Sequence, residues 1–283
     1  MARNTTSSPG KPAYKRHTFL SIDGEGVGRR PHVYTFLAGA DRHGNVFMRV
    51  SHPSTRDALA ALLLIPRKFT VVSYSFHYDL TKILVDLPNE SLYKLFRPET
   101  RQRWHFGSQR LITDPVIWKG YSLDWCAGRF TIKGLRSGRK VVLWDIFKFF
   151  ACAFVKTLEL WKSAPPEVVA RIRAMKEQRA EFDKLSESEV NAYCLDECRY
   201  LAETAHRLYD AHCEAGLKLK GFYGAGSTSG ALLTQLDVQD HRNDGPEEMR
   251  NALASAFYGV RFEISRRGTV RMKVYNYDIS SAY

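Results

Sequence analysis

The chain of 283 residues has few cysteines and no hydrophobic run long enough for a membrane span. Its five cysteines are odd in number and scattered, which argues against a disulfide framework and indicates a reducing compartment. Cys194 and Cys198 lie one helical turn apart, but no second pair of ligands has zinc spacing. We see no signal peptide, so we expect no membrane partner and an intracellular protein that is not secreted. Its location would be the cytoplasm of a host cell, or an organelle if a plasmid encodes it.

Acidic residues are also scarce relative to basic ones. The 30 Asp and Glu stand against 42 Lys and Arg, which gives a net charge of +12 and favours a polyanionic partner such as nucleic acid. The excess is largest between residues 97 and 140, where basic residues alternate with aromatic ones. This segment is either a surface that grips single-stranded DNA or a solvated basic hairpin. Its candidate DNA-binding residues are Arg103, Arg129 and Lys133.

Hydrophobic periodicity predicts an α/β protein with a mixed sheet and flanking helices. The expected strands are 18–22, 33–40, 45–50 and 69–73, with irregular β structure over 97–147 that ends in a strand at 140–145. The expected helices are 53–65, 76–87, a charged helix over 167–183, and a long helix that begins at the capping box of Ser186 and Glu189. We interpret the charges of 167–183 as a solvated face.

The two ends of the sequence differ from its middle. Residues 1–16 form a polar, basic tail that we expect to be disordered. Residues 216–244 begin with a segment rich in glycine and serine, which is typical of a boundary between domains. A helix and a hairpin are expected over 245–283.

Two carboxylates, Asp23 and Glu25, follow the first expected strand. The glycines around them would allow a tight turn and a close approach to a ligand. Two carboxylates so close together repel each other, so they either face water or share divalent cations. Taken alone, the pair is more simply interpreted as an acidic turn in solvent.

Two further acids fall on the apolar sides of expected helices. Asp79 shares its side of a helix with Leu80, and Glu197 lies on the apolar stripe of the last long helix. Tyr193, four residues before Glu197, projects from the same face, whereas Asp196 lies on the polar side. A carboxylate that faces the core needs a cation or hydrogen-bond donors, so these positions predict a positive charge nearby.

These acids occur in an order that resembles the 3′-5′ proofreading exonuclease of family B DNA polymerases, which has the ribonuclease H-like fold. Asp23-Gly24-Glu25 matches the first motif, Asp-x-Glu. Ser75 and Asp79 match the second, in which the family usually has Asn at the position of Ser75. Tyr193 and Glu197 match the third, Tyr-x-x-x-Asp, with Glu in place of Asp. The neighbouring Asp196 is therefore an alternative ligand, although the helix-face argument favours Glu197.

The last residues resemble a polymerase motif. Tyr277-Asp278-Ile279-Ser280-Ser281-Ala282-Tyr283 is similar to the approach to motif A, Asp-x-x-Ser-x-Tyr-Pro, and is most like the protein-primed branch found in phages and linear plasmids. The resemblance thus implies an exonuclease domain over 17–215, a connecting segment over 216–244, and the start of a polymerase palm over 245–283. The palm would be incomplete, so we expect no primer extension from this chain.

The resemblance also implies a set of site residues. Two Mg²⁺ or Mn²⁺ ions would be bound by Asp23, Glu25, Asp79 and Glu197, with Asp278 as the first metal ligand of the polymerase site. Tyr193 would orient the attacking water, and Ser75, Phe76 and Lys156 would contact DNA. The partners would be single-stranded and primer–template DNA and a terminal priming protein, and the chain would be a monomer.

The function expected from this resemblance is hydrolysis of 3′-terminal nucleotides by two-metal catalysis, within a DNA polymerase. Two alternatives stay open. One is a free-standing nuclease of the same fold. The other is a non-catalytic module that binds single-stranded DNA, in which the change from Asp to Glu at 197 has abolished metal binding.

Overall fold

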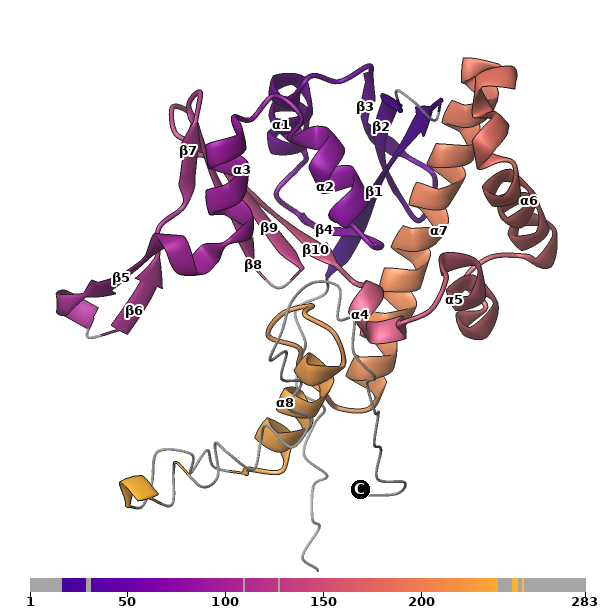
Figure 1. The fold of residues 1–283 in the computed structure, drawn as a ribbon. Helices are drawn as coiled ribbons and strands as arrows, with labels where there is room; N and C mark the ends of the chain where they lie inside the picture. The colour runs from indigo at the N-terminus through magenta and orange to yellow at the C-terminus, as the bar shows by residue number, and fades with distance from the viewer. Residues whose placement is uncertain are drawn as a thin grey trace, which may run out of the picture. The chain divides into compact units, whose positions relative to one another are not determined.

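The computed structural model describes residues 17–28, 32–108, 110–126, 128–238, 246–248 and 251. Residues 17–237 of this set belong to one compact α/β unit with an eight-stranded mixed sheet (Figure 1). The α/β class predicted from periodicity is confirmed. The predicted tail 1–16, and Asp278 with the residues around it, lie outside the described residues. Within the described residues, no helix combines the length and apolar character needed to cross a membrane.

The strands of the main sheet follow the order β3-β2-β1-β4-β10-β9-β8-β7. Their bounds are β1 Thr18–Val27, β2 Val33–Asp41, β3 Val46–Ser51, β4 Phe69–Ser73, β7 Val116–Trp118, β8 Tyr121–Cys126, β9 Arg129–Gly134 and β10 Lys140–Asp145. Strands β1, β4 and β10 are parallel to one another, and every other neighbouring pair is antiparallel. The C-terminal ends of these three parallel strands therefore lie at the same edge of the sheet.

Helices cover both faces of this sheet. Their bounds are α1 Thr55–Leu64, α2 His77–Ile83, α3 Asn89–Phe96, α4 Phe147–Phe150, α5 Phe154–Trp161, α6 Pro166–Glu177, α7 Glu187–Glu214 and α8 Ala225–Gln235. In Figure 1, α1, α2 and α3 lie over one face, and α7 lies over the other with α5 and α6 beside it. The strand alternation of β1 follows this division, since Leu20 and Ile22 pack with α1 and α2 while Phe19 packs with α7.

The structure differs from the sequence expectations for this unit in four places. The stretch after Ile22 is not a tight turn, because β1 continues to Val27 and pairs with β2 along its length, with an irregularity between Glu25 and Gly26. Residues 167–183 are not one helix, because α6 ends at Glu177 and a 3₁₀ helix, η3 (Arg179–Lys184), follows it. Helix α5 was not expected at all, and α8 lies inside the segment interpreted as a linker.

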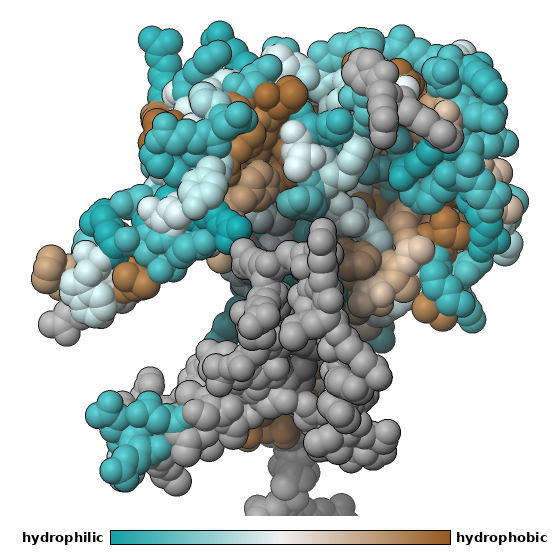
Figure 2. All heavy atoms as spheres, viewed as in Figure 1, coloured by the Kyte–Doolittle hydropathy of each residue, from teal (hydrophilic) through white to brown (hydrophobic). Residues whose placement is uncertain are grey.

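Part of the basic segment projects from the main sheet as a separate two-stranded hairpin. Strands β5 (Gln102–His105) and β6 (Arg110–Thr113) pair with each other and with no other strand of the described residues. Trp104 and Phe106 are 51% and 84% exposed. Figure 2 shows hydrophobic residues among hydrophilic ones on this projection. The hairpin is therefore well exposed, as both interpretations of the segment require.

Helix α7 carries an acid of the candidate site, and its start is fixed by the predicted capping box. Ser186 Oγ accepts from the backbone N–H of Glu189, and the Glu189 carboxylate accepts from the backbone N–H of Ser186 at 2.9 Å. This exchange satisfies two backbone donors that the first turn of a helix leaves free.

We predict that Ser186→Ala lowers the free energy of unfolding by about 1 kcal/mol, because the cap is lost and no packing changes. In a protein of this size the melting temperature should fall by about 2–4 °C. Ser186→Thr, whose hydroxyl can still accept from the Glu189 N–H and donate to its carboxylate, is the control and should stay close to the wild-type value. Equal melting temperatures for the alanine variant and the wild type would contradict the capping role.

Candidate metal centre

Asp23 and Glu25 share one face of β1 because successive side chains of a strand alternate. Both carboxylates point toward α7, on the side where Ser21 hydrogen-bonds the backbone carbonyl of Cys198. Cys194 Sγ contacts the carbonyl oxygen of Asp23 at 3.4 Å, which holds the helix against the strand. The spacing of one residue between the two acids is therefore what brings them together, without a turn.

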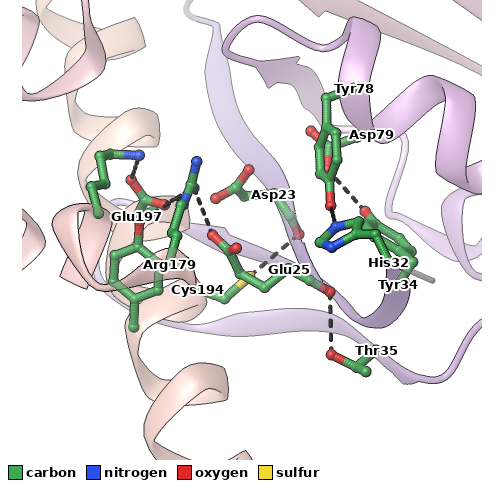
Figure 3. A network of polar contacts seen from close by, with 12 residues as sticks. Asp23, Glu25, His32, Tyr34, Thr35, Tyr78, Asp79, Arg179, Cys194 and Glu197 are labelled. Carbon is green, nitrogen blue, oxygen red and sulfur yellow. Dashed lines mark hydrogen bonds and ion pairs between the residues drawn. The ribbon is translucent and has the colours of Figure 1, made fainter. Parts of the chain in front are cut away.

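Glu197 completes the cluster from α7. One carboxylate oxygen from each of Asp23, Glu25 and Glu197 lies within 4.8 Å of the other two, and Figure 3 shows the three groups facing one another. Glu25 and Glu197 are 4% and 3% exposed, and Asp23 is partly exposed. Three acids from two elements thus converge on one point.

Asp79 approaches the same point from the first turn of α2. It is 3% exposed and accepts a hydrogen bond from Tyr34 Oη at 3.0 Å. Tyr34 crosses β1 at Gly24, where a Cβ atom would lie 1.7 Å from the phenol oxygen. The glycine between the two acids is therefore required by packing, since any side chain there would push Tyr34 away from Asp79.

A fifth carboxylate, Asp145 at the end of β10, fixes the entry to α2. It accepts backbone N–H bonds from Ser75 at 2.9 Å and Phe76 at 3.1 Å. These bonds hold Ser75 at φ 57°, in the left-handed region, immediately before the helix. Asp145 therefore positions Asp79 through the backbone and is not itself in the cluster. The sequence pattern gave no sign of this role.

Burial and mutual repulsion shift the acid–base behaviour of these groups. Burial, with repulsion from Glu197 and Asp79, raises the pKa of Asp23 well above its ordinary value. Burial also raises the pKa of Glu25 to about 8, although Arg179 opposes the rise. The pKa of Asp79 rises to about 7 by burial, against the hydrogen bond from Tyr34. Without added positive charge, ionisation of these carboxylates is thus unfavourable.

Two cations partly compensate the negative charge of the cluster. Lys176 Nζ lies 2.5 Å from Glu197 Oε1, and Arg179 Nη2 lies 2.8 Å from Glu25 Oε1 and 3.4 Å from Glu197 Oε2. Figure 3 shows the guanidinium of Arg179 between the two glutamates. The interpretation of 167–183 as a solvated face is therefore wrong for these two side chains. Their spacing from Ile172, by four and seven residues, is the helical signal that could have revealed them.

The third motif has the geometry expected from its helix face. Glu197 is buried in the cluster, whereas Asp196 pairs with Arg171 of α6 at 2.5 Å. Tyr193 is buried, and its hydroxyl lies 3.3 Å from Arg179 Nη2. Burial raises the pKa of Tyr193 above its ordinary value, so the phenol stays protonated at neutral pH.

The cluster opens into a cavity of about 340 Å³. Asp23, Asp79 and Glu197 lie in its wall together with Lys176 and Arg179. Four aromatic side chains also line it, namely Tyr74, Tyr78, Phe147 and Phe154. The cavity therefore combines paired acids, two cations and flat apolar surfaces, a set that suits a ligand with both a phosphate and a ring.

The residues predicted to contact DNA do not form one surface. Ser75 lines the cavity, whereas the side chain of Phe76 is completely buried against Trp125 and Phe130. Arg103 pairs with Asp114 on the hairpin, and Arg129 with Asp124. Lys133 and Lys156 are exposed elsewhere, on β9 and α5.

The donor set of the cluster fits a divalent cation. Hard ions such as Mg²⁺ and Mn²⁺ prefer carboxylate oxygens, and three of these lie within reach of a single ion. Glu197 Oε1 is buried and has no hydrogen bond of acceptable geometry, although Lys176 is close. Lys176 therefore competes with a metal ion for this oxygen. The three acids could thus hold a metal ion, with Asp79 beside them.

Comparison of the chain with known protein families, curated proteins and solved structures found no match.

We predict that Arg179→Ala lowers the thermal stability of the protein in EDTA, because Glu25 and Glu197 lose their shared cation. Arg179 is about half exposed, so screening limits the loss to roughly 1–3 kcal/mol. Added Mn²⁺ should then raise the melting temperature of the variant more than that of the wild type, since no guanidinium competes for the carboxylates.

The matched control is Arg173→Ala, which removes an arginine of α6 that pairs with Glu159 outside the cluster. It should leave the Mn²⁺ shift unchanged. An equal Mn²⁺ shift in Arg179→Ala and the wild type would contradict the competition between guanidinium and metal.

Proposed function

We propose that this chain is a metal-dependent 3′-5′ DNA exonuclease of the ribonuclease H-like type, equivalent to the N-terminal part of a family B DNA polymerase. The observation that carries the proposal is the convergence of Asp23, Glu25 and Glu197 within 4.8 Å, with buried Asp79 beside them, at an open cavity. The three elements that supply these acids are far apart in the sequence, which is unusual for a chance acidic patch.

The topology supports the finer fold assignment. An antiparallel run of β1, β2 and β3 is followed by β4 and β10, which are parallel to β1, and helices cover both faces. The acids gather beyond the C-terminal end of β4, where its parallel pairing with β1 has stopped, and open α/β sheets commonly bind ligands at such ends. A ribonuclease H-like sheet with an added β7–β8–β9 meander accounts for this order.

In this proposal Asp23, Glu25, Glu197 and Asp79 hold divalent cations. Such ions supply Lewis acidity and an ionised water for hydrolysis of a phosphodiester. Arg179 reaches the cluster from the cavity wall, so its guanidinium can bind the phosphate group of the substrate with paired hydrogen bonds. Tyr193 stays protonated and positions Arg179 through the contact between their polar atoms.

The aromatic wall of the cavity supports a nucleotide substrate. Tyr78 and the partly exposed rings of Tyr74 and Phe147 offer surface on which an unpaired base can stack without regard to sequence, whereas Phe154 is buried beneath Lys176. The Tyr74 hydroxyl bonds Thr157 at 2.7 Å and the carbonyl of Cys152 at 2.6 Å, which fixes its ring. A single-stranded 3′ end is therefore the substrate that this site fits best.

A second function is favoured by one specific observation. Lys176 and Arg179 already compensate the buried carboxylates, so the protein does not require a metal to tolerate them. In this alternative the chain is a non-catalytic module that binds single-stranded DNA. Release of mononucleotides distinguishes the two functions.

We predict that the wild type with Mn²⁺ releases mononucleotides from a single strand labelled at its 5′ end. Glu197→Gln should lower the rate by at least about 100-fold, because the variant keeps the shape of the side chain and loses a charged ligand. Asp196→Asn, the adjacent acid that pairs with Arg171, is the matched control and should stay within about threefold of wild type.

Gel analysis of the shortened products gives the rates. No release by the wild type under conditions where a proofreading exonuclease is active would leave only the non-catalytic module. A severe loss in Asp196→Asn with a mild loss in Glu197→Gln would show that Asp196 is the ligand.

A further inference from the structure

A second charged surface lies away from the carboxylate cluster, where eight cations gather around one end of the sheet. We call it the basic end surface. Its residues are Arg56, Arg67, Lys68, Lys119, Lys133, Arg136, Arg139 and Lys140. All are exposed except Arg139, which is partly buried and donates to the carbonyl of Ile65 at 3.1 Å. In the described part of the chain these eight make no ion pair.

The lack of an ion pair distinguishes the four arginines of this surface from most other arginines of the described chain. Many of its other arginines pair with an acid, namely Arg42, Arg97, Arg101, Arg103, Arg129, Arg171, Arg173, Arg179 and Arg207. The nearest acid of α1, Asp57, is engaged in the capping box with Ser54. The positive charge of the basic end surface is therefore uncompensated within the described residues.

Two of these cations are placed directly opposite each other. Lys133 of β9 pairs with Lys140 of β10 in the antiparallel register, so both side chains project from the same face of the sheet. Like charges directly opposite on neighbouring strands are destabilising. Folding alone gives no reason for this pair, whereas an anion bound between the two ammonium groups would relieve the repulsion.

The surface is hollowed on both sides of the sheet end. One hollow of about 540 Å³ is lined by Arg56, Lys119, Arg136 and Arg139 with Leu64. The other, of about 330 Å³, is lined by Arg67 and Lys140 with apolar side chains of β4 and β10. No Asp or Glu of the described chain lines either hollow. Four of the cations line one hollow and two line the other, so they do not converge on one point.

This arrangement fits an extended polyanion better than a small anion. The basic end surface is also remote from the carboxylates. Leu20 of β1 and Leu143 of β10 both pair with Val71 of β4, so these residues lie side by side across the parallel strands. Lys140 lies three residues before this level and Asp23 three residues after it. At about 3.3 Å per residue, roughly 20 Å of strand separates the two sites.

We propose that the basic end surface binds the phosphodiester backbone of nucleic acid, at a site separate from the carboxylate cavity. The unpaired cations contact successive phosphates and release their counterions, which gives binding that depends on salt and not on sequence. The site needs neither a 3′ end nor a metal ion, so it does not depend on the proposed exonuclease activity. It holds the body of a strand while a different part of the protein meets the end.

The test measures binding of the protein to a closed circular single strand in EDTA, which offers no 3′ end and allows no hydrolysis. The variant Arg136→Ala/Lys140→Ala removes one cation from each hollow. The slope of log K against log salt should become shallower by about 1.4, at about 0.7 for each lost phosphate contact. Its melting temperature should not fall, because both side chains are exposed and one repulsion is relieved.

The matched control is Lys218→Ala/Lys220→Ala, which removes two exposed cations from outside the surface and should keep the wild-type slope. Asp23→Asn should bind the circle as the wild type does, whatever its nuclease activity. An unchanged slope in Arg136→Ala/Lys140→Ala, or an equal change in the control, would overturn the proposal. Binding to phosphatidylserine vesicles with no binding to the circle would overturn it too.

Discussion

The structure depends on how four carboxylates are accommodated in one largely buried site. Three neighbouring elements compensate part of this negative charge. Strand β2 supplies the Tyr34 hydroxyl to Asp79, α6 supplies Lys176 to Glu197, and η3 supplies Arg179 to both glutamates. Even so, burial keeps the pKa values of Asp23, Glu25 and Asp79 raised. The compensation is incomplete, and this leaves the cluster with affinity for further positive charge.

The sequence predicted which acids belong to this site better than it predicted the backbone conformation and contacts around them. Helix periodicity placed Glu197 inside and Asp196 outside, and the structure confirms both because a helix face is fixed by local spacing. The turn expected at Asp23 was wrong, since glycine permits a turn but pairing with β2 decides whether one forms. Gly24 serves a contact with Tyr34, a residue distant in sequence, which no local pattern can show.

The cations of the site were missed for a related reason. A helix with many charged residues is usually exposed to solvent. Composition alone therefore does not distinguish the few charged side chains that face inward from those that face solvent. Lys176 and Arg179 continue the apolar row of Ile172, but η3 breaks the helix before Arg179, and its final position depends on tertiary contacts. The fold class was predictable from strand and helix periods, whereas the sheet order depended on long-range pairing.

Glu197 stands where the exonuclease family that the sequence resembles usually has an aspartate. A glutamate at 197 is one methylene longer than an aspartate, yet its oxygens come within 4.8 Å of ligand atoms on both strand acids. The change therefore leaves the carboxylate within reach of a shared ion, so it is no argument by itself for lost metal binding. The deciding competition is between a divalent cation and the guanidinium of Arg179. A doubly charged ion can contact three carboxylates at once, whereas the closest atom of Arg179 lies 2.8 Å from one of them and 3.4 Å from another. Arg179 is also half exposed on a short 3₁₀ helix, so a metal ion that replaces its charge would let it leave the cluster and remain at the cavity wall as a phosphate ligand. The geometry is thus compatible with displacement of Arg179 by a metal ion, as the proposed exonuclease requires.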